Sequence, residues 1–65
     1  MKPKTLNALL RVYNQLDEIV EELNSLSDDA VDSGDYEDAS LLQARADILY
    51  QQMENLEVVI AEHEE

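Results

Sequence analysis

Apolar residues recur at alternating intervals of three and four positions through both halves of this chain, and the only glycine, Gly34, lies between the halves. In the first half the series is Leu9, Val12, Leu16, Ile19, Leu23, Leu26 and Ala30. In the second half it is Ala39, Leu42, Ala46, Leu49, Met53, Leu56 and Ile60. Such spacing keeps one face of an α-helix apolar. The pattern predicts an all-α fold, an antiparallel two-helix hairpin with coiled-coil-like packing.

The residues around the two apolar series predict where each helix begins and ends. Thr5 is a favourable N-cap for the first helix, which we expect over about residues 6–32. Gly34 favours the left-handed conformation that ends a helix, within a turn at 33–35. Asp35 can cap the second helix, expected over about residues 36–62, and the acidic Glu37 and Asp38 suit its first turn. Residues 1–65 then form a single domain.

A two-helix seam leaves further apolar residues uncovered. From the residues beside the two series we predict a dimer interface composed of Leu6, Leu10, Tyr13, Val20, Leu41, Ile48 and Tyr50. A chain of 65 residues buries too little surface to be comfortably stable alone, and it contains no cysteine for a disulfide. We therefore expect a homodimer arranged as a four-helix bundle. A helix from another protein would serve equally well as the covering element.

The charge of the chain excludes several classes of partner. Sixteen acidic and four basic residues give a net charge of −12. This charge repels phosphate backbones and anionic lipid surfaces, so we expect no direct binding to nucleic acid and no association with a membrane. No apolar run approaches the length of a membrane span or of a secretory signal, which favours a cytoplasmic location.

An acidic cluster surrounds the predicted turn. Its members, with the neighbouring tyrosine, are the residues that we predict to bind a protein partner: Asp28, Asp29, Asp32, Asp35, Tyr36 and Asp38. A calcium-binding loop does not fit this cluster. With Gly34 at the sixth loop position, the third and twelfth positions are Val31 and Ser40, which are not carboxylates.

The sequence contains no constellation typical of an enzyme. His63 is the only histidine, and it lies among glutamates near the C-terminus. No histidine or lysine is placed to activate a serine such as Ser27 or Ser33, and a seam filled with Leu, Ile and Ala offers no cleft to perturb a carboxylate pKa. We therefore expect a non-enzymatic protein without cofactors or metal ions.

The stretch from Leu23 to Leu49 resembles the UVR motif, a short helical hairpin of nucleotide-excision-repair proteins. The resemblance rests on Leu23, Ala30 and the run Asp35-Tyr36-Glu37-Asp38-Ala39 at the bend. The motif continues with a leucine-arginine-aspartate triplet, whereas here Leu42 is followed by Gln43 and Ala44. What the resemblance implies is a protein-binding hairpin and not a role in DNA repair. In size and plan the chain is also similar to the plasmid RNA-binding Rop family, without the basic face that RNA binding requires.

These observations favour a small acidic regulatory or tethering protein that binds a protein partner through its acidic helical surface. Proteins of this kind are encoded by phages, plasmids and bacterial accessory genes. The alternative is a DNA-mimic inhibitor that occupies the basic groove of a nucleic-acid-binding protein. Oligomers larger than two would indicate a structural assembly factor instead.

Overall fold

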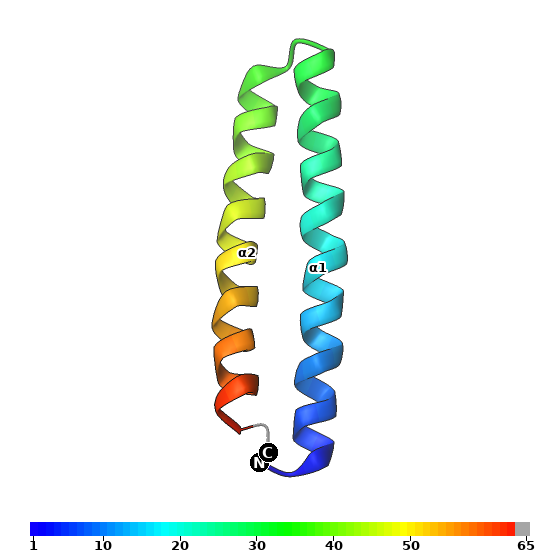
Figure 1. Ribbon diagram of the computed structural model, residues 1–65. Coiled ribbons are helices and arrows are strands. Elements are labelled where there is room, and N and C mark those ends of the chain that lie inside the picture. The colour runs from blue at the N-terminus through cyan, green and yellow to red at the C-terminus, as the bar shows by residue number, and fades with distance from the viewer. Residues whose placement is uncertain (64–65) are drawn as a thin grey trace.

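The computed structural model describes residues 1–63, and it is an antiparallel hairpin of two helices, α1 (Pro3–Asp32) and α2 (Tyr36–His63) (Figure 1). The predicted all-α hairpin is confirmed. The molecule is a rod with extents of 48, 14 and 11 Å. Its radius of gyration is 14.9 Å, whereas a compact domain of this length has one of about 11 Å.

Helix α1 begins one turn earlier than the sequence predicted. Pro3 occupies the first helical position and Lys2 the N-cap position, and the Leu6 N–H donates to the Lys2 carbonyl at 3.0 Å. Proline fits the first helical position because its φ is already helical and its missing N–H has no helical partner there. Thr5 is therefore inside the helix, and its prediction as the N-cap is wrong.

The turn ends α1 with a Schellman motif. The Asp35 N–H donates to the Ala30 carbonyl at 2.8 Å, and the Gly34 N–H donates to the Val31 carbonyl at 3.0 Å. Gly34 has a φ of 79°, the left-handed conformation that the sequence predicted for it. Asp35 then begins α2, because its carbonyl accepts the Ala39 N–H at 2.9 Å. The direction of α2 is thus fixed by backbone hydrogen bonds.

The face of α2 that meets α1 is the predicted one. Its residues form two rows with a spacing of seven. The inner row of α2, which is buried, consists of Ala39, Ala46, Met53 and Ile60. The middle row of α2, which is half-buried, consists of Leu42, Leu49 and Leu56.

The face of α1 that meets α2 is rotated relative to the prediction. Its inner row consists of Leu6, Tyr13, Val20 and Ser27, and its middle row consists of Leu9, Leu16, Leu23 and Ala30. Three residues of the predicted seam form instead an outer row that remains 40–45% exposed: Val12, Ile19 and Leu26. The expectation that this outer row packs against α2 is wrong.

Ser27 explains why the apolar pattern misled. A search for apolar residues at the seam selects Leu26 over its polar neighbour. In the structure Ser27 is 6% exposed, and its hydroxyl donates to the Ala39 carbonyl at 3.0 Å. A buried hydroxyl with a hydrogen-bond partner is tolerated in a core. The small side chain also lets α1 lie close to Ala39, which a leucine would prevent.

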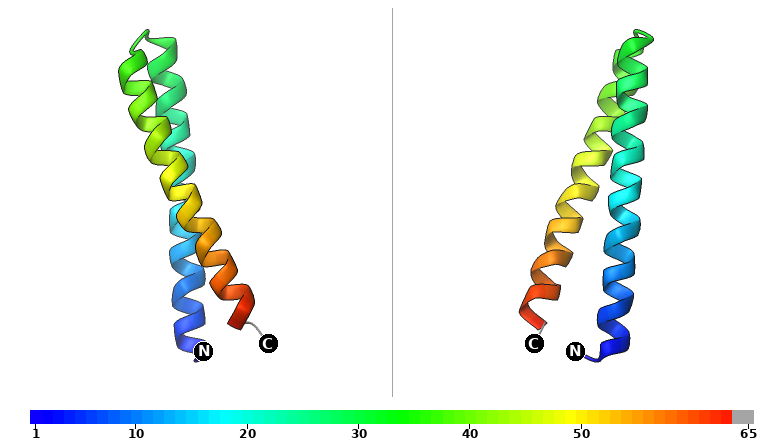
Figure 2. Two further views of the ribbon diagram at one scale, coloured as in Figure 1. Left: turned by 90° about the vertical axis from the view of Figure 1, so that its left-hand side faces the viewer. Right: turned by 45° about the vertical axis from the view of Figure 1, so that its right-hand side comes forward.

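Small side chains place the closest approach of the helices in the half nearest the turn. Ser27, Ala39 and Ala46 all lie in this half and are buried. Farther from the turn, Val20 and Met53 complete the core. Figure 2 shows the two helices crossing and separating toward the chain ends. The core is thin, because no large side chain among the described residues is completely buried.

Within residues 1–63, neither helix is long and apolar enough to cross a membrane.

Replacing Val20 by alanine tests the position of the seam. Val20 is 6% exposed, so Val20→Ala should lower the free energy of unfolding by about 2 kcal/mol through lost burial and a small cavity. Val58 is 55% exposed, and the same substitution there should change stability by less than about 0.5 kcal/mol. Urea denaturation followed by circular dichroism measures both at one protein concentration. Equal effects would contradict the seam described here.

Replacing Gly34 tests the turn. An added Cβ would meet no atom within 4 Å, so the cost of Gly34→Ala comes only from the left-handed φ and should be about 1–2 kcal/mol. Gly34→Asn should cost less, because asparagine adopts this conformation more readily. Melting temperatures of the two variants give the order. An asparagine variant less stable than the alanine variant would contradict the strain argument.

Candidate protein-interaction surfaces

The turn end of the hairpin, residues 28–38, is called the tip here. All six residues predicted to bind a partner lie in it, and all six are exposed. Asp28, Asp29 and Asp32 come from the last turns of α1, where spacings of one, three and four residues place them on the side away from α2. Asp35 and Asp38 come from the turn and the first turn of α2. The Schellman motif therefore brings acids from both helices to one end of the rod.

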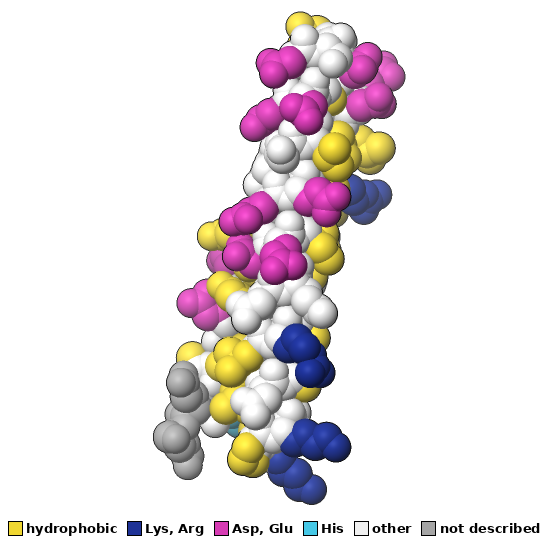
Figure 3. All heavy atoms as spheres, turned by 90° about the vertical axis from the view of Figure 1, so that its right-hand side faces the viewer, with side chains coloured by type: hydrophobic (Ala, Val, Ile, Leu, Met, Phe, Trp, Pro, Cys, Tyr) yellow, Lys and Arg dark blue, Asp and Glu magenta, His cyan; other side chains and the backbone are white. Residues whose placement is uncertain are grey.

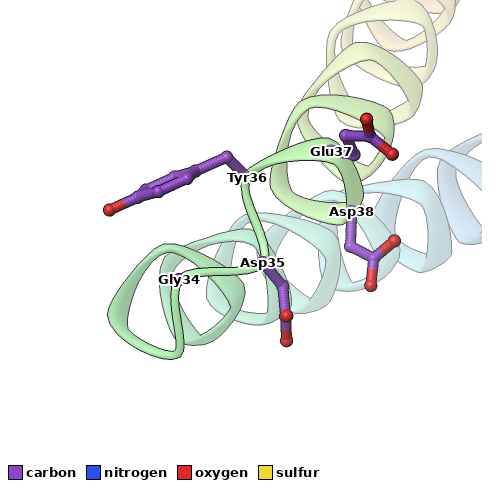
Figure 4. A pocket seen from close by; sticks show the side chains of 5 residues that line it. All are labelled: Gly34, Asp35, Tyr36, Glu37 and Asp38. Atoms are coloured by element: carbon purple, nitrogen blue, oxygen red, sulfur yellow. The ribbon is translucent and has the colours of Figure 1, made fainter.

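Tyr36 is the most exposed large apolar side chain among the described residues, at 69%. Figure 4 shows its ring projecting away from both helices, while Glu37 and Asp38 point to the other side of α2. Gly34, Asp35 and these three residues line a shallow open hollow. The predicted site residues thus share the tip without forming one flat surface. A partner that contacts both Tyr36 and Asp38 must surround the tip.

Charge is divided between the two halves of α1. The segment up to Leu16 carries Lys2, Lys4 and Arg11 and no acid, whereas the segment from Asp17 to Asp32 carries only acids. These acids are Asp17, Glu18, Glu21, Glu22, Asp28, Asp29 and Asp32. Figure 3 shows this division on the outward side of α1, with acidic side chains toward the turn and most basic ones toward the chain ends. The helix surface therefore has a positive and a negative end.

One long side of the hairpin, called the open face here, is apolar. On α1 it is formed by the outer row and the half-buried middle row. Together these two rows give a second complete series of three-and-four spacing, from Leu9 to Ala30. On α2 the exposed apolar members are Leu41, Ile48 and Val59, at 58%, 47% and 39%, and the row of Val59 also contains the exposed Arg45 and Gln52. Helix α1 thus has two apolar stripes, of which α2 covers one.

The geometry of antiparallel helices places these residues on one side. Around each helix, the inner row is followed by the middle row and then by a third row. On α1 this third row is the outer row, which begins at Val12. On α2 it is the row with a spacing of seven that contains Val59. Leu41 and Ile48 follow in the same sense of rotation. Because the helices run in opposite directions, this sense leads to the same side of the hairpin for both. Half-burial of every described middle-row residue agrees with an open side there.

The opposite side of the hairpin holds an acidic, partly apolar hollow. Leu10, Tyr13, Glu57 and Ile60 line it. Partial burial, and then the negative charges of Glu57 and Asp17, raise the pKa of Tyr13 above its ordinary value of 10.0, with a further contribution from Tyr50. The Tyr13 phenol, whose pKa lies above 10.0, is protonated at physiological pH, as an unshifted tyrosine also is, and can form hydrogen bonds there.

The structure separates the seven residues predicted to form a dimer interface. Val20 is buried in the hairpin's own core, so its prediction as an interface residue is wrong. Leu6 and Tyr13 belong to the same inner row and are half-buried. Leu41 and Ile48 are exposed on the open face. The last two, Leu10 and Tyr50, are exposed on the opposite side with Tyr13. Sequence reasoning missed the outer row, because it had already placed those residues inside the seam.

Within residues 1–63, no three His, Cys, Asp or Glu side chains converge as metal ligands. Among the described residues, hollows are lined by residues of the tip, of the Tyr13 side and of the chain ends. The arrangement is suited to contacts between macromolecular surfaces, with a charged tip and an apolar side.

No family model, curated protein or solved structure matches this chain. The likeness to the UVR motif therefore stays a resemblance between short stretches of sequence. The helical hairpin that it implies is the fold that the structure has. A fold of this kind is shared by proteins of many functions, so the function must be argued from the surfaces.

The raised pKa of Tyr13 predicts a loss of stability in alkali. Above pH 10.0 the unfolded chain releases the Tyr13 proton before the folded chain does, so stability falls as the pH rises through the folded pKa. Tyr13→Phe should remove this part of the loss. Melting temperatures of both proteins at neutral pH and between about pH 9 and 11 measure the difference. A parallel decline in the two proteins would contradict the assigned environment.

Proposed function

We propose that this protein is a small non-enzymatic binding protein whose tip docks on a basic surface of a protein partner. The observation that carries the proposal is Tyr36, a 69% exposed aromatic ring that projects from the tip, whose exposed carboxylates of Asp35, Glu37 and Asp38 point in other directions (Figure 4). Tyrosine is among the residues that contribute most to binding at protein interfaces. Its ring supplies contact area at a low cost in conformational entropy.

The local structure supports this role for the tip. Three backbone hydrogen bonds at the end of α1 and the one that begins α2 fix the turn, so little ordering is needed when a partner binds. The surrounding carboxylates attract a basic surface and orient it during encounter. An aromatic side chain on a fixed turn, with carboxylates on the same tip, is a combination typical of a specific docking site.

Charge density favours docking over DNA mimicry. The net charge of −12 along a rod of 48 Å corresponds to about one charge per 4 Å, whereas duplex DNA carries one per about 1.7 Å. The half of α1 that begins the chain also carries three basic residues, which a mimic of a phosphate backbone would not present. The binding experiment with the charge variants also distinguishes DNA mimicry from docking by the tip.

Two charge variants with the same net charge test the tip. The first is Asp28→Asn with Asp29→Asn, Asp32→Asn and Asp35→Asn, and the second is Asp17→Asn with Glu18→Gln, Glu21→Gln and Glu22→Gln. Capture from bacterial lysate on immobilised protein, quantified by mass spectrometry, should fall about tenfold or more for the first variant. The second should retain most of the bound partner, because it leaves the tip intact. Circular dichroism confirms that both remain helical.

A photoreactive benzophenone side chain in place of Tyr36 should cross-link to the same partner. The matched position is Tyr50, which is 54% exposed and lies about 21 Å farther along α2. Equal loss of capture in the two charge variants, or cross-linking from Tyr50 and not from Tyr36, would refute binding by the tip. Binding that duplex DNA displaces and that weakens steeply with salt would establish mimicry instead.

A further inference from the structure

The hairpin exposes more surface than a chain of its size does when it is fully packed. A compact monomer of 7.4 kDa exposes about 4,200 Å², whereas this chain exposes 5044 Å². The surplus of about 800 Å² equals the area that each partner contributes to a standard protein interface. Part of this exposed surface is the open face, whose exposed apolar side chains are spaced seven residues apart along α1. The hairpin thus exposes enough additional surface for one side of a standard interface.

We infer that the open face binds a second copy of this chain, with α1 packed antiparallel on α1 of the second copy around a two-fold axis at Ile19. An occupant must present an apolar helical stripe of equal length that has no partner of its own. The stripe from Leu9 to Ala30 is such a surface, about 32 Å long. Two copies cover each other's stripe, as an interface with two-fold symmetry requires.

The spacing of the outer row fits this axis. Val12 and Leu26 lie at equal distances of seven residues on either side of Ile19. In the antiparallel arrangement Ile19 therefore meets Ile19 of the second copy, and Val12 meets Leu26. The row needs no shift in register to fill the interface along its whole length.

Helix α2 is consistent with the same axis. Ser27 bonds to Ala39, and Ile19 lies eight residues before Ser27, so Ile19 lies at the level of about residue 47 of α2. Of the exposed apolar residues of α2 on the open face, Ile48 lies closest to that level. The axis that pairs Ile19 with Ile19 thus passes near Ile48 of both copies, and the product is a four-helix bundle.

Charge selects the antiparallel orientation. In a parallel pair the acidic halves of α1 would lie side by side, which is unfavourable for a chain with a net charge of −12. In the antiparallel pair the half of α1 with Lys2, Lys4 and Arg11 lies beside the acidic half of the second copy.

The rows that face the second copy contain few ionisable residues. Arg45 is the only one in the middle and outer rows of α1 and in the corresponding rows of α2 from Leu42 to Val59. Little charge is therefore buried in the interface.

Single cysteines test both the surface and the axis, because the natural chain contains none. Ile19→Cys should form a disulfide-linked dimer under mild oxidation, since the axis brings the two sulfurs together. Val12→Cys alone should not, because its two copies lie about 21 Å apart along the helix, and a disulfide needs Cα atoms within about 7 Å. A mixture of Val12→Cys and Leu26→Cys chains should form the mixed dimer. Val58→Cys, on the exposed outer side of α2, is the control.

Sedimentation equilibrium of the unmodified chain gives the second measurement. The expected mass is twice 7.4 kDa, and Ile19→Asp should reduce it to that of one chain, while Val58→Asp should not. A monomeric natural chain refutes the proposal. A dimer in which Val12→Cys links to itself refutes the antiparallel axis, and a dimer that links through Val58 and not through Ile19 refutes the assigned face. These readouts need no knowledge of the partner that binds the tip.

Discussion

The close contact between the inner rows of α1 and α2 determines the rest of this structure. Ser27, Ala39 and Ala46 are small enough for the helices to approach near the turn, and the hydrogen bond from Ser27 to the Ala39 carbonyl joins them there. Because the helices meet through their inner rows, every described middle-row residue is left half-buried. The apolar open face is thus a consequence of how the two helices pack.

The sequence predicted α2 more accurately than α1 for a physical reason. In α2 the apolar series coincides with the seam, since the residues next to it at the same level include Arg45 and Gln52. In α1 two apolar series overlap and share Leu9, Leu16, Leu23 and Ala30. A pattern of apolar residues cannot distinguish them, because the true seam contains the polar Ser27 and the half-polar Tyr13. The signal that distinguishes them lies on the other helix: Ala39 and Ala46 require a small partner, and Ser27 supplies it.

The candidate tip residues show a different limit of sequence reasoning. Their exposure and their common location follow from a glycine turn flanked by acids, and the sequence was sufficient to predict both. Their directions were not predictable from composition. The rotation of 100° per residue sends Tyr36 and Asp38 to different sides of α2, as Figure 4 shows. A shared segment of sequence therefore does not imply a shared binding surface.

The two proposed surfaces are compatible, because they occupy different parts of the rod. The axis at Ile19 lies near the middle of the 48 Å length, so the antiparallel dimer leaves both tips free at opposite ends. Two tips about 45 Å apart on a rigid body would bind two sites on one partner assembly far more tightly than one tip binds, but only where the sites have that spacing. The length of the hairpin then contributes to specificity: the number of residues between Ile19 and Gly34 sets the distance between the tips, at about 1.5 Å per residue on each side. Helix length, which contributes little to the chemistry of either tip, would in this way determine which assemblies the dimer can bridge.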